Sequence, residues 1–205
     1  MKILQTLLEK PWTAEQIPLD NAHNGIAYAL PTAKLGLRVL LSAITVLLAL
    51  FVIAYSDRMT LSDWHPLSEP WLIWVNTLIL VLSSVAMNRA LAAARDRRIG
   101  GIKTWFLAAG GSALLFLLGQ LFVWQQLLAA GYYAAGHPAA AFFYLLTALH
   151  GIHLFGGLVA WGRVMARLGK NPDMAKLHES VDLCTAYWHY LLVVWLIFFT
   201  LLLFT

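Results

Sequence analysis

The segment Tyr144–Trp161, YLLTALHGIHLFGGLVAW, decides how the rest of the chain is interpreted. It is apolar enough to lie in a lipid bilayer, yet it carries His150 and His153. Ionisable groups inside a bilayer are costly and are candidates for a function. From the residues alone, the two imidazoles could be ligands of a metal or a haem, parts of a proton route, or hydrogen-bonding groups between helices.

The composition is that of a membrane protein. Of the 205 residues, 60% are hydrophobic and only 12% are charged, and the mean hydropathy is +0.71. A soluble domain carries roughly 25% charged residues. The single cysteine, Cys184, excludes an internal disulfide framework and a thiolate metal cluster. The basic residues flank the apolar segments and form no face of their own, which argues against a nucleic-acid partner.

Five apolar segments are long enough to cross a bilayer, which takes about 20 residues. They are residues 35–55, 71–94, 105–128, 139–161 and 183–204. We therefore predict an all-α integral membrane protein in which residues 35–205 form a domain of five transmembrane helices. Residues 1–34 are expected to form a cytoplasmic arm, because the apolar run of a cleavable signal peptide is interrupted at Glu9.

The distribution of basic residues predicts the orientation. The loops after the second and fourth spans are rich in them: Arg95, Arg97, Arg98, Lys103, Arg163, Arg167, Lys170 and Lys176. The loops on the other side carry only Arg58. Because positive charge stays in the cytoplasm, the N-terminus should lie inside and the C-terminus outside a bacterial inner membrane. Asn171 as a cap and Pro172 at the first helical position predict that the fifth helix begins near Asp173.

Polar and small residues recur on single faces of the predicted helices. The stripes are Asn76, Thr77, Ser83, Ser84 and Asn88 in the second span, Ser112, Gly119 and Gln126 in the third, and His178, Asp182, Thr185 and His189 in the fifth. Such residues commonly mark contacts between membrane helices. We expect the hydroxyl, amide and glycine positions to lie at helix–helix interfaces.

The ligand sets for a metal or a haem are incomplete. A bis-histidine haem needs two facing imidazoles with room for the macrocycle. A zinc site needs three or four converging ligands. Only His153, His189 and Asp182 could supply three, and their spacing is not specific. Hydrogen-bonded structure or lipid contact, a proton-related role and a metal role therefore remain open from the residues alone.

Four segments resemble successive motifs of subunit III of the haem-copper respiratory oxidases. They are NTLILVLSS (76–84), GQLFVWQQ (119–126), TALHGIHLFGG (147–157) and DLCTAYWHYLLVVW (182–195). They follow one another in the family's order across the last four helices. The H-G-x-H motif of one helix and the Y-W-H motif of the next are the most specific part of the match. The number of spans is similar to that of the short bacterial form of the subunit.

This resemblance implies a non-redox accessory subunit in an aerobic respiratory chain. Members of this family hold no haem or copper. The haems and copper belong to the catalytic subunit I, beside which subunit III lies in the complex with subunit II. The resemblance also implies a cleft, filled with phospholipid, between two helices and the other three. The subunit is expected to stabilise the catalytic subunit, bind lipid and support proton uptake, and to catalyse nothing itself.

The resemblance also assigns roles to individual residues. None is expected to be catalytic or to bind a metal. A structural polar cluster is expected from His150, His153, His178, Asp182 and His189. Contacts with phospholipid are expected at Arg38, Trp71, Trp74, Arg95, Arg97 and Arg98, because basic and tryptophan side chains suit headgroup depth.

Three positions depart from the family pattern. Ile44, Ala129 and Leu192 stand where that family often has acidic residues. The electron donor of the complex, cytochrome c or quinol, is left open. One alternative function is an accessory subunit of a nitric oxide reductase. A more distant one is a free-standing membrane protein that uses His150, His153 and His189 for metal or proton chemistry.

Overall fold

The computed structural model describes residues 32–65, 70–169 and 173–203. These residues form α3 (Thr32–Arg58), α4 (Leu72–Arg95), α5 (Ile99–Ala129), α6 (Pro138–Leu168) and α7 (Met174–Leu203). All five helices are long and apolar enough to cross a membrane, which confirms the prediction of an all-α chain with five spans. Most of the predicted arm, as well as Asn171 and Pro172, lies outside the described residues; the described end of that arm is already helical.

Two helices extend well past their predicted spans. α5 begins at Ile99 and α6 continues to Leu168, because backbone hydrogen bonding does not stop where the apolar stretch ends. The last helix begins at Met174, close to the predicted start. Its cap is Asp173, whose carboxylate accepts a hydrogen bond from the backbone N–H of Ala175 at 3.0 Å.

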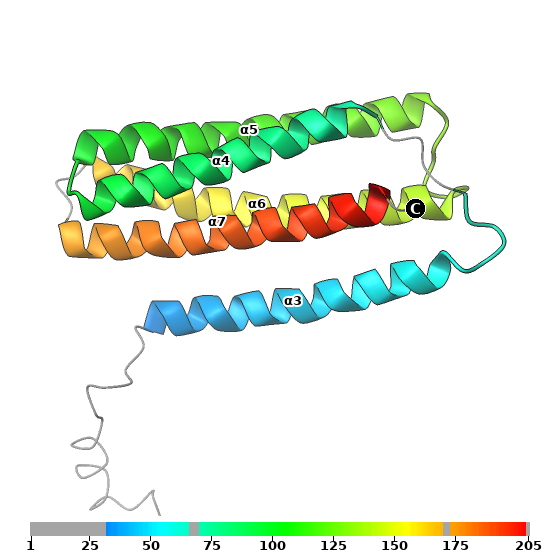
Figure 1. Cartoon of the computed structure of the whole chain (residues 1–205), viewed down its shortest axis with the longest axis horizontal. Coiled ribbons are helices and arrows are strands. Elements are labelled where there is room, and N and C mark those ends of the chain that lie inside the picture. The colour runs from blue at the N-terminus through cyan, green and yellow to red at the C-terminus, as the bar shows by residue number, and fades with distance from the viewer. Residues whose placement is uncertain (1–31, 66–69, 170–172, 204–205) are drawn as a thin grey trace, which may run out of the picture. The chain divides into compact units, whose positions relative to one another are not determined.

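Four of the helices form a closed ring. α4 packs against α5 and α7, and α6 packs against the same two helices (Figure 1). The interior of the ring is rich in large aromatic side chains, each at most 1% exposed: Phe106, Phe116, Phe143, Trp188 and Trp195. Rings of this size bury much apolar area with few rotatable bonds, so they give the bundle a well-defined core.

Indole–hydroxyl hydrogen bonds join α4 to α7. Trp195 Nε1 donates to Thr77 Oγ1 at 3.0 Å, and Trp188 Nε1 donates to Ser83 Oγ at 2.9 Å. Ser83 Oγ in turn donates to the backbone oxygen of Ala109 on α5, at 2.7 Å. The prediction that the polar stripe of the second span marks helix contacts is therefore confirmed.

The polar stripe predicted for the third span includes one residue, Gln126, that does not lie at a helix contact. Gln126 is exposed, whereas Gln120 is 95% buried, since 5% of its surface is exposed. Asn76 Nδ2 donates to Gln120 Oε1 at 3.4 Å, and Gly119 lies against the same asparagine amide. The expectation for Gln126 was wrong because α5 turns its Gln120 face toward α4.

α3 is joined to the ring by few contacts. Residues 39–205 form one compact unit. Within that unit, only 6% of the most apolar window of α3 is buried, against 39–56% for the other helices. The hydroxyls of Tyr190 and Thr45 share a hydrogen bond of 2.9 Å. Near the other end of α3, the ring of Tyr55 meets those of Trp64 and Phe142 edge to face.

The expected division into two helices against three is therefore not observed. The second span, α4, belongs to the ring with α5 and α7. The physical reason lies in the sequences of the first two spans. α4 carries the hydroxyl and amide groups that bond to neighbouring helices, whereas α3 is almost uniformly apolar.

An ion pair holds the turn that follows α3. The guanidinium of Arg58 donates to both carboxylate oxygens of Asp63, at 2.7 and 2.5 Å. This hydrogen bonding keeps the pKa of the Asp63 carboxyl below its ordinary value. Because the folded-state pKa is lowered, the pair is intact above that range and is lost as the pH falls through the lowered value. Asp63 is exposed and Arg58 is half-buried, so solvent weakens the attraction and the pair fixes geometry more than stability.

α4 and α5 end in the same backbone motif with different residues at its critical position. After α4, the N–H groups of Arg97 and Arg98 bond to the oxygens of Ala94 and Ala93. After α5, those of Gly131 and Tyr132 bond to the oxygens of Leu128 and Leu127. This pattern needs a left-handed residue, usually glycine. Gly131 has φ 88°, and Arg97 has φ 55° with a full side chain.

We predict that Arg97→Gly raises the free energy of unfolding by up to about 1 kcal/mol, because it relieves the left-handed strain at some cost in chain entropy. Gly131→Ala should lower it by about 1 kcal/mol for the converse reason. Unfolding of the purified variants in mild detergent measures both. If Arg97→Gly were as destabilising as Gly131→Ala, the arginine side chain and not the backbone would control this turn.

Gly110 allows α5 and α6 to approach closely. A Cβ atom at Gly110 would overlap the indole of Trp161, whereas one at Gly111 would meet no atom within 4 Å. Trp161 Nε1 donates to the backbone oxygen of Phe106 at 2.7 Å, in the turn that precedes Gly110. The glycine therefore makes room for a tryptophan that binds the backbone of the facing helix.

We predict that Gly110→Ala destabilises the protein by about 1–3 kcal/mol, because Trp161 must move away and lose its hydrogen bond. Gly111→Ala is the matched control and should be neutral or slightly stabilising. Thermal unfolding of the two variants in the same detergent distinguishes them. Equal melting temperatures would show that the α5–α6 contact does not depend on this close approach.

Candidate functional site

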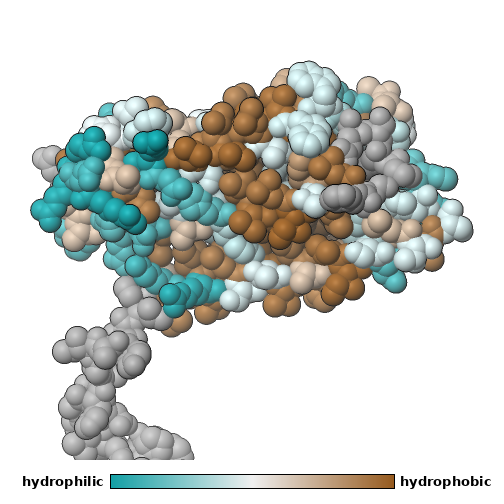
Figure 2. All heavy atoms as spheres, in the orientation of Figure 1, coloured by the Kyte–Doolittle hydropathy of each residue, from teal (hydrophilic) through white to brown (hydrophobic). Residues whose placement is uncertain are grey.

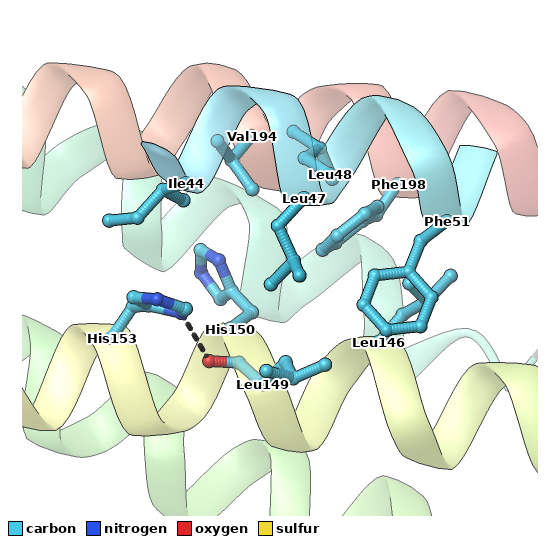
Figure 3. Close-up of a pocket in the computed structure, with 10 residues that line it drawn as sticks. All are labelled: Ile44, Leu47, Leu48, Phe51, Leu146, Leu149, His150, His153, Val194 and Phe198. Carbon is cyan, nitrogen blue, oxygen red and sulfur yellow. Dashed lines mark hydrogen bonds between the residues drawn. The ribbon is translucent and has the colours of Figure 1, made fainter. Parts of the chain in front are cut away.

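A small cavity lies where α3 passes the α6–α7 pair. Its volume is about 20 Å³. The walls are aliphatic and aromatic, apart from His150 and His153 of α6 (Figure 3). The apolar lining residues are Ile44, Leu47, Leu48, Phe51, Leu146, Leu149, Val194 and Phe198. The segment with which the sequence analysis began therefore supplies the polar groups at this place.

His150 is buried among aromatic rings. It is 2% exposed, and its ring lies 5.8 Å from that of Phe116, 5.3 Å from Trp195 and 6.4 Å from Phe198, between centroids. Within the described part of the chain, neither ring nitrogen has a hydrogen-bond partner. An imidazole in this setting is neutral, because the charged form would be unsolvated. His150 joins α6 to α7 by ring packing and not by a hydrogen bond.

His153 is held by its own helix. Its Nδ1 and the backbone oxygen of Leu149 are 2.7 Å apart, so Nδ1 carries the proton and donates (Figure 3). The backbone oxygen of His153 accepts a hydrogen bond from the hydroxyl of Tyr187 on α7, at 2.9 Å. Gly157, one turn further along α6, makes room for the Tyr187 ring. The pairing of α6 with α7 thus uses the backbone of the H-G-x-H segment.

His189 bonds to α4. Its Nδ1 is in contact with the hydroxyl of Ser84, and its Nε2 lies 2.8 Å from Asn88 Oδ1. The amide oxygen can only accept, so Nε2 donates to it and Nδ1 accepts from Ser84. These bonds use both ring nitrogens and fix the tautomer. The predicted polar face of the last helix therefore contacts the predicted polar face of the second span.

His178 lies at the end of the bundle where the basic residues gather. A cavity of about 440 Å³ between the end of α4 and the start of α7 is lined by Arg95, Arg97, Met174 and His178, with two alanines. Figure 2 shows hydrophilic residues collected at this end, beside a hydrophobic band across the middle of the molecule. Asp182, one turn beyond His178, is half-buried.

The four histidines of the expected polar cluster thus occupy three places. His150 and His153 line one cavity, His189 binds α4, and His178 lines the cavity at the basic end. Among the described residues, no group of three or more His, Cys, Asp or Glu side chains is arranged to hold a metal ion. These side chains can donate and accept hydrogen bonds and can pack against neighbouring rings.

The residues expected to contact lipid lie at both ends. Trp71 and Trp74 are 71% and 55% exposed, and Trp74 also packs edge to face on Phe199. At the basic end Arg95, Arg97 and Arg98 are exposed. Arg98 forms an exposed ion pair of 2.7 Å with Asp96. Arg38 is exposed in the first turns of α3.

The three departures from the family pattern have different surroundings. Ile44 is 8% exposed and lines the cavity with His150 and His153. Leu192 is half-buried and packs against the main core, whereas Ala129 ends α5 in an exposed position. Only Ile44 therefore changes the chemistry of a described cavity, because an acidic residue there would face the two imidazoles.

Sequence reasoning missed two polar contacts between helices. One is that of Gln120 on α5 with Asn76 on α4, and the other is that of Tyr190 on α7 with Thr45 on α3. Gln120 was overlooked in favour of Gln126, although the spacing of Phe116, Gln120 and Val123 follows the buried face of α5. The bond between Tyr190 and Thr45 joins residues far apart in the chain, and nothing in either segment indicates the partner.

Comparisons with known proteins point to one family. A family model for cytochrome c oxidase subunit III matches residues 34–205. The cytochrome c oxidase subunit 3 of Thermostichus vulcanus is 30% identical over an aligned length of 205 residues, and the alignment covers 97% of each chain. That of Synechocystis sp. is 30% identical over 161 residues, 76% of this chain and 68% of the relative.

A more local match has the same identity. The probable cytochrome c oxidase subunit 3 of Mycobacterium tuberculosis (strain H37Rv) is 30% identical over 128 residues, 62% of this chain and 63% of the relative. The chain thus spans somewhat less than two thirds of the length of the mycobacterial relatives that it matches. The family match covers all five helices, including the His150–His153 segment and the partner face of α7. The chain belongs to the cytochrome c oxidase subunit III family.

Proposed function

We propose that this chain is the non-redox accessory subunit of a haem-copper terminal oxidase in the inner membrane of a bacterium. The observation that carries the proposal is the family match over residues 34–205. The relatives described above are named as subunits of cytochrome c oxidases, which favours such an oxidase over a nitric oxide reductase. The haems and copper of the complex would belong to the catalytic subunit I, with subunit II as a further partner.

The role in the complex would be structural. Several polar side chains of the ring bond to a neighbouring helix of the same ring, as Trp195 does to Thr77 and His189 to Asn88. A rigid bundle of this kind offers a fixed surface to a larger membrane partner. The basic residues at one end support an orientation with that end and the N-terminus in the cytoplasm.

We further propose that the basic end binds anionic phospholipid. The cavity of about 440 Å³ presents Arg95, Arg97 and His178 beside the first turn of α7. The N-terminus of a helix carries partial positive charge, which adds to that of the arginines. Trp71 and Trp74 at the opposite end suit the other interface. Proton uptake by the catalytic subunit would draw on the same end, where His178 and Asp182 are near the surface.

Isolation of the complex tests the proposed function. A tagged chain purified in mild detergent should bring with it a large multi-span partner, and the preparation should show a haem absorption spectrum. The partners are identified by mass spectrometry. A colourless preparation without a haem protein would contradict the proposal, and a nitric oxide reductase as the partner would replace it with the alternative.

Lipid binding is tested with two arginines and a matched control. Each basic side chain near the surface contributes about 1 kcal/mol of attraction to anionic lipid, so Arg95→Gln with Arg97→Gln should weaken the binding of anionic phospholipid by roughly 30-fold and lower the amount retained. Arg98→Gln should have a smaller effect, because that charge is already paired with Asp96. Lipid mass spectrometry of the purified complexes gives the ratio. Equal losses in both preparations would refute a site at Arg95 and Arg97.

A substitution at Asp182 tests whether this residue has a structural or a catalytic role. Asp182→Asn should loosen this chain from the complex or lower its melting temperature, while complexes that retain it should still reduce oxygen. Subunit retention is read from the purified complex and turnover from oxygen consumption. An intact complex without turnover would show that Asp182 takes part in catalysis, against the proposed structural role.

A further inference from the structure

The cavity between α3, α6 and α7 combines an apolar wall with a buried polar group. His150 is 98% buried, since 2% of its surface is exposed, and it lines the cavity. Both of its ring nitrogens lack a hydrogen-bond partner among the described residues. Figure 3 shows the rings of His150 and His153 on the side of α6 that faces Ile44. A buried polar group without a partner is unfavourable, so the cavity favours an occupant that can hydrogen-bond.

The second polar group in the cavity has a defined role. His153 donates from Nδ1 to the backbone oxygen of Leu149, at 2.7 Å. In the neutral ring, Nε2 is then left as an acceptor. An occupant must therefore donate to His153. It must also satisfy a nitrogen of His150, which accepts or donates according to the tautomer of that ring.

The size of the cavity selects among possible occupants. Its volume of about 20 Å³ is too small for a lipid headgroup or a ring compound. One buried water needs at least about 10–15 Å³ and two to four polar partners. Residues three apart on a helix have neighbouring side chains, with about 5–6 Å between their Cβ atoms, a separation that one water can bridge. A metal ion is disfavoured, because no third ligand among the described residues converges here.

We propose that the cavity binds one water molecule that bridges the imidazoles of His150 and His153. The water donates to Nε2 of His153 and bonds to a ring nitrogen of His150. Ile44 closes the site from α3 and supplies no polar atom, so the water takes the place that an acidic side chain at position 44 could occupy. This site is independent of the accessory role proposed above and adds a hydrated polar pair to the apolar contact of α3 with α6.

A structure of the purified complex that resolves buried waters tests the site directly. A density peak within hydrogen-bonding distance of ring nitrogens of both His150 and His153 is expected. The peak should disappear in His150→Phe. A wild-type map with ordered buried waters elsewhere and none at this place would refute the proposal, as would a peak that persists in His150→Phe.

A cavity-filling variant gives a second test, in which the direction of the change in melting temperature is the result. Ile44→Phe occupies the cavity without changing either histidine. If water is bound, this variant strands two polar rings and should lower the melting temperature of the complex by a few degrees. In the His150→Phe background the same change should be neutral or stabilising, because the unpartnered ring nitrogens of His150 are gone. An equal decrease in both backgrounds would mean simple overpacking, and an increase in the wild-type background would mean a dry cavity; either result would contradict the bridging water.

Discussion

The constraint on which the structure depends is that polar groups within an apolar medium must find partners inside the protein. In the ring of α4 to α7, hydroxyl side chains of α4 serve as hydrogen-bond partners for the indole and imidazole nitrogens of α7. Thr77, Ser83 and Ser84 of α4 bond to two indoles and one imidazole of α7. Removing one of these hydroxyls takes a hydrogen-bond partner from a ring nitrogen of α7, so α4 and α7 are specified as neighbours by more than packing area.

The same constraint explains the position of α3. This helix has few polar groups that need partners, and a uniformly apolar surface is as stable against lipid as against protein. Its contact with the ring is therefore light and depends on the hydroxyl of Tyr190 and the rings around Tyr55. Because few side chains of α3 are buried against the ring, a cavity remains between α3 and the ring beside His150. A chain with an acidic residue in place of Ile44 would bring a charge or a strong hydrogen bond into this contact.

Two kinds of glycine and one arginine show how local geometry supports the packing. Gly110 and Gly119 are required because neighbouring side chains, Trp161 and Asn76, occupy the space of a Cβ. Gly131 is required by its backbone angle. Arg97 stands in the equivalent backbone position after α4 and keeps a positive charge at the basic end. A residue with a full side chain therefore occupies a left-handed backbone position at the end of the bundle where the basic residues lie.

The sequence by itself determined the helical class, the number of spans and the interface role of the α4 stripe, because hydrocarbon thickness and polar periodicity are local properties. Its motifs also indicated the family. Only the tertiary structure decided that α4 joins the ring, that Gln120 and not Gln126 is buried, and that His150, His178 and His189 lie in three places. Those outcomes depend on the rotation of each helix about its axis, which long-range pairs such as Tyr190 with Thr45 and His189 with Asn88 fix.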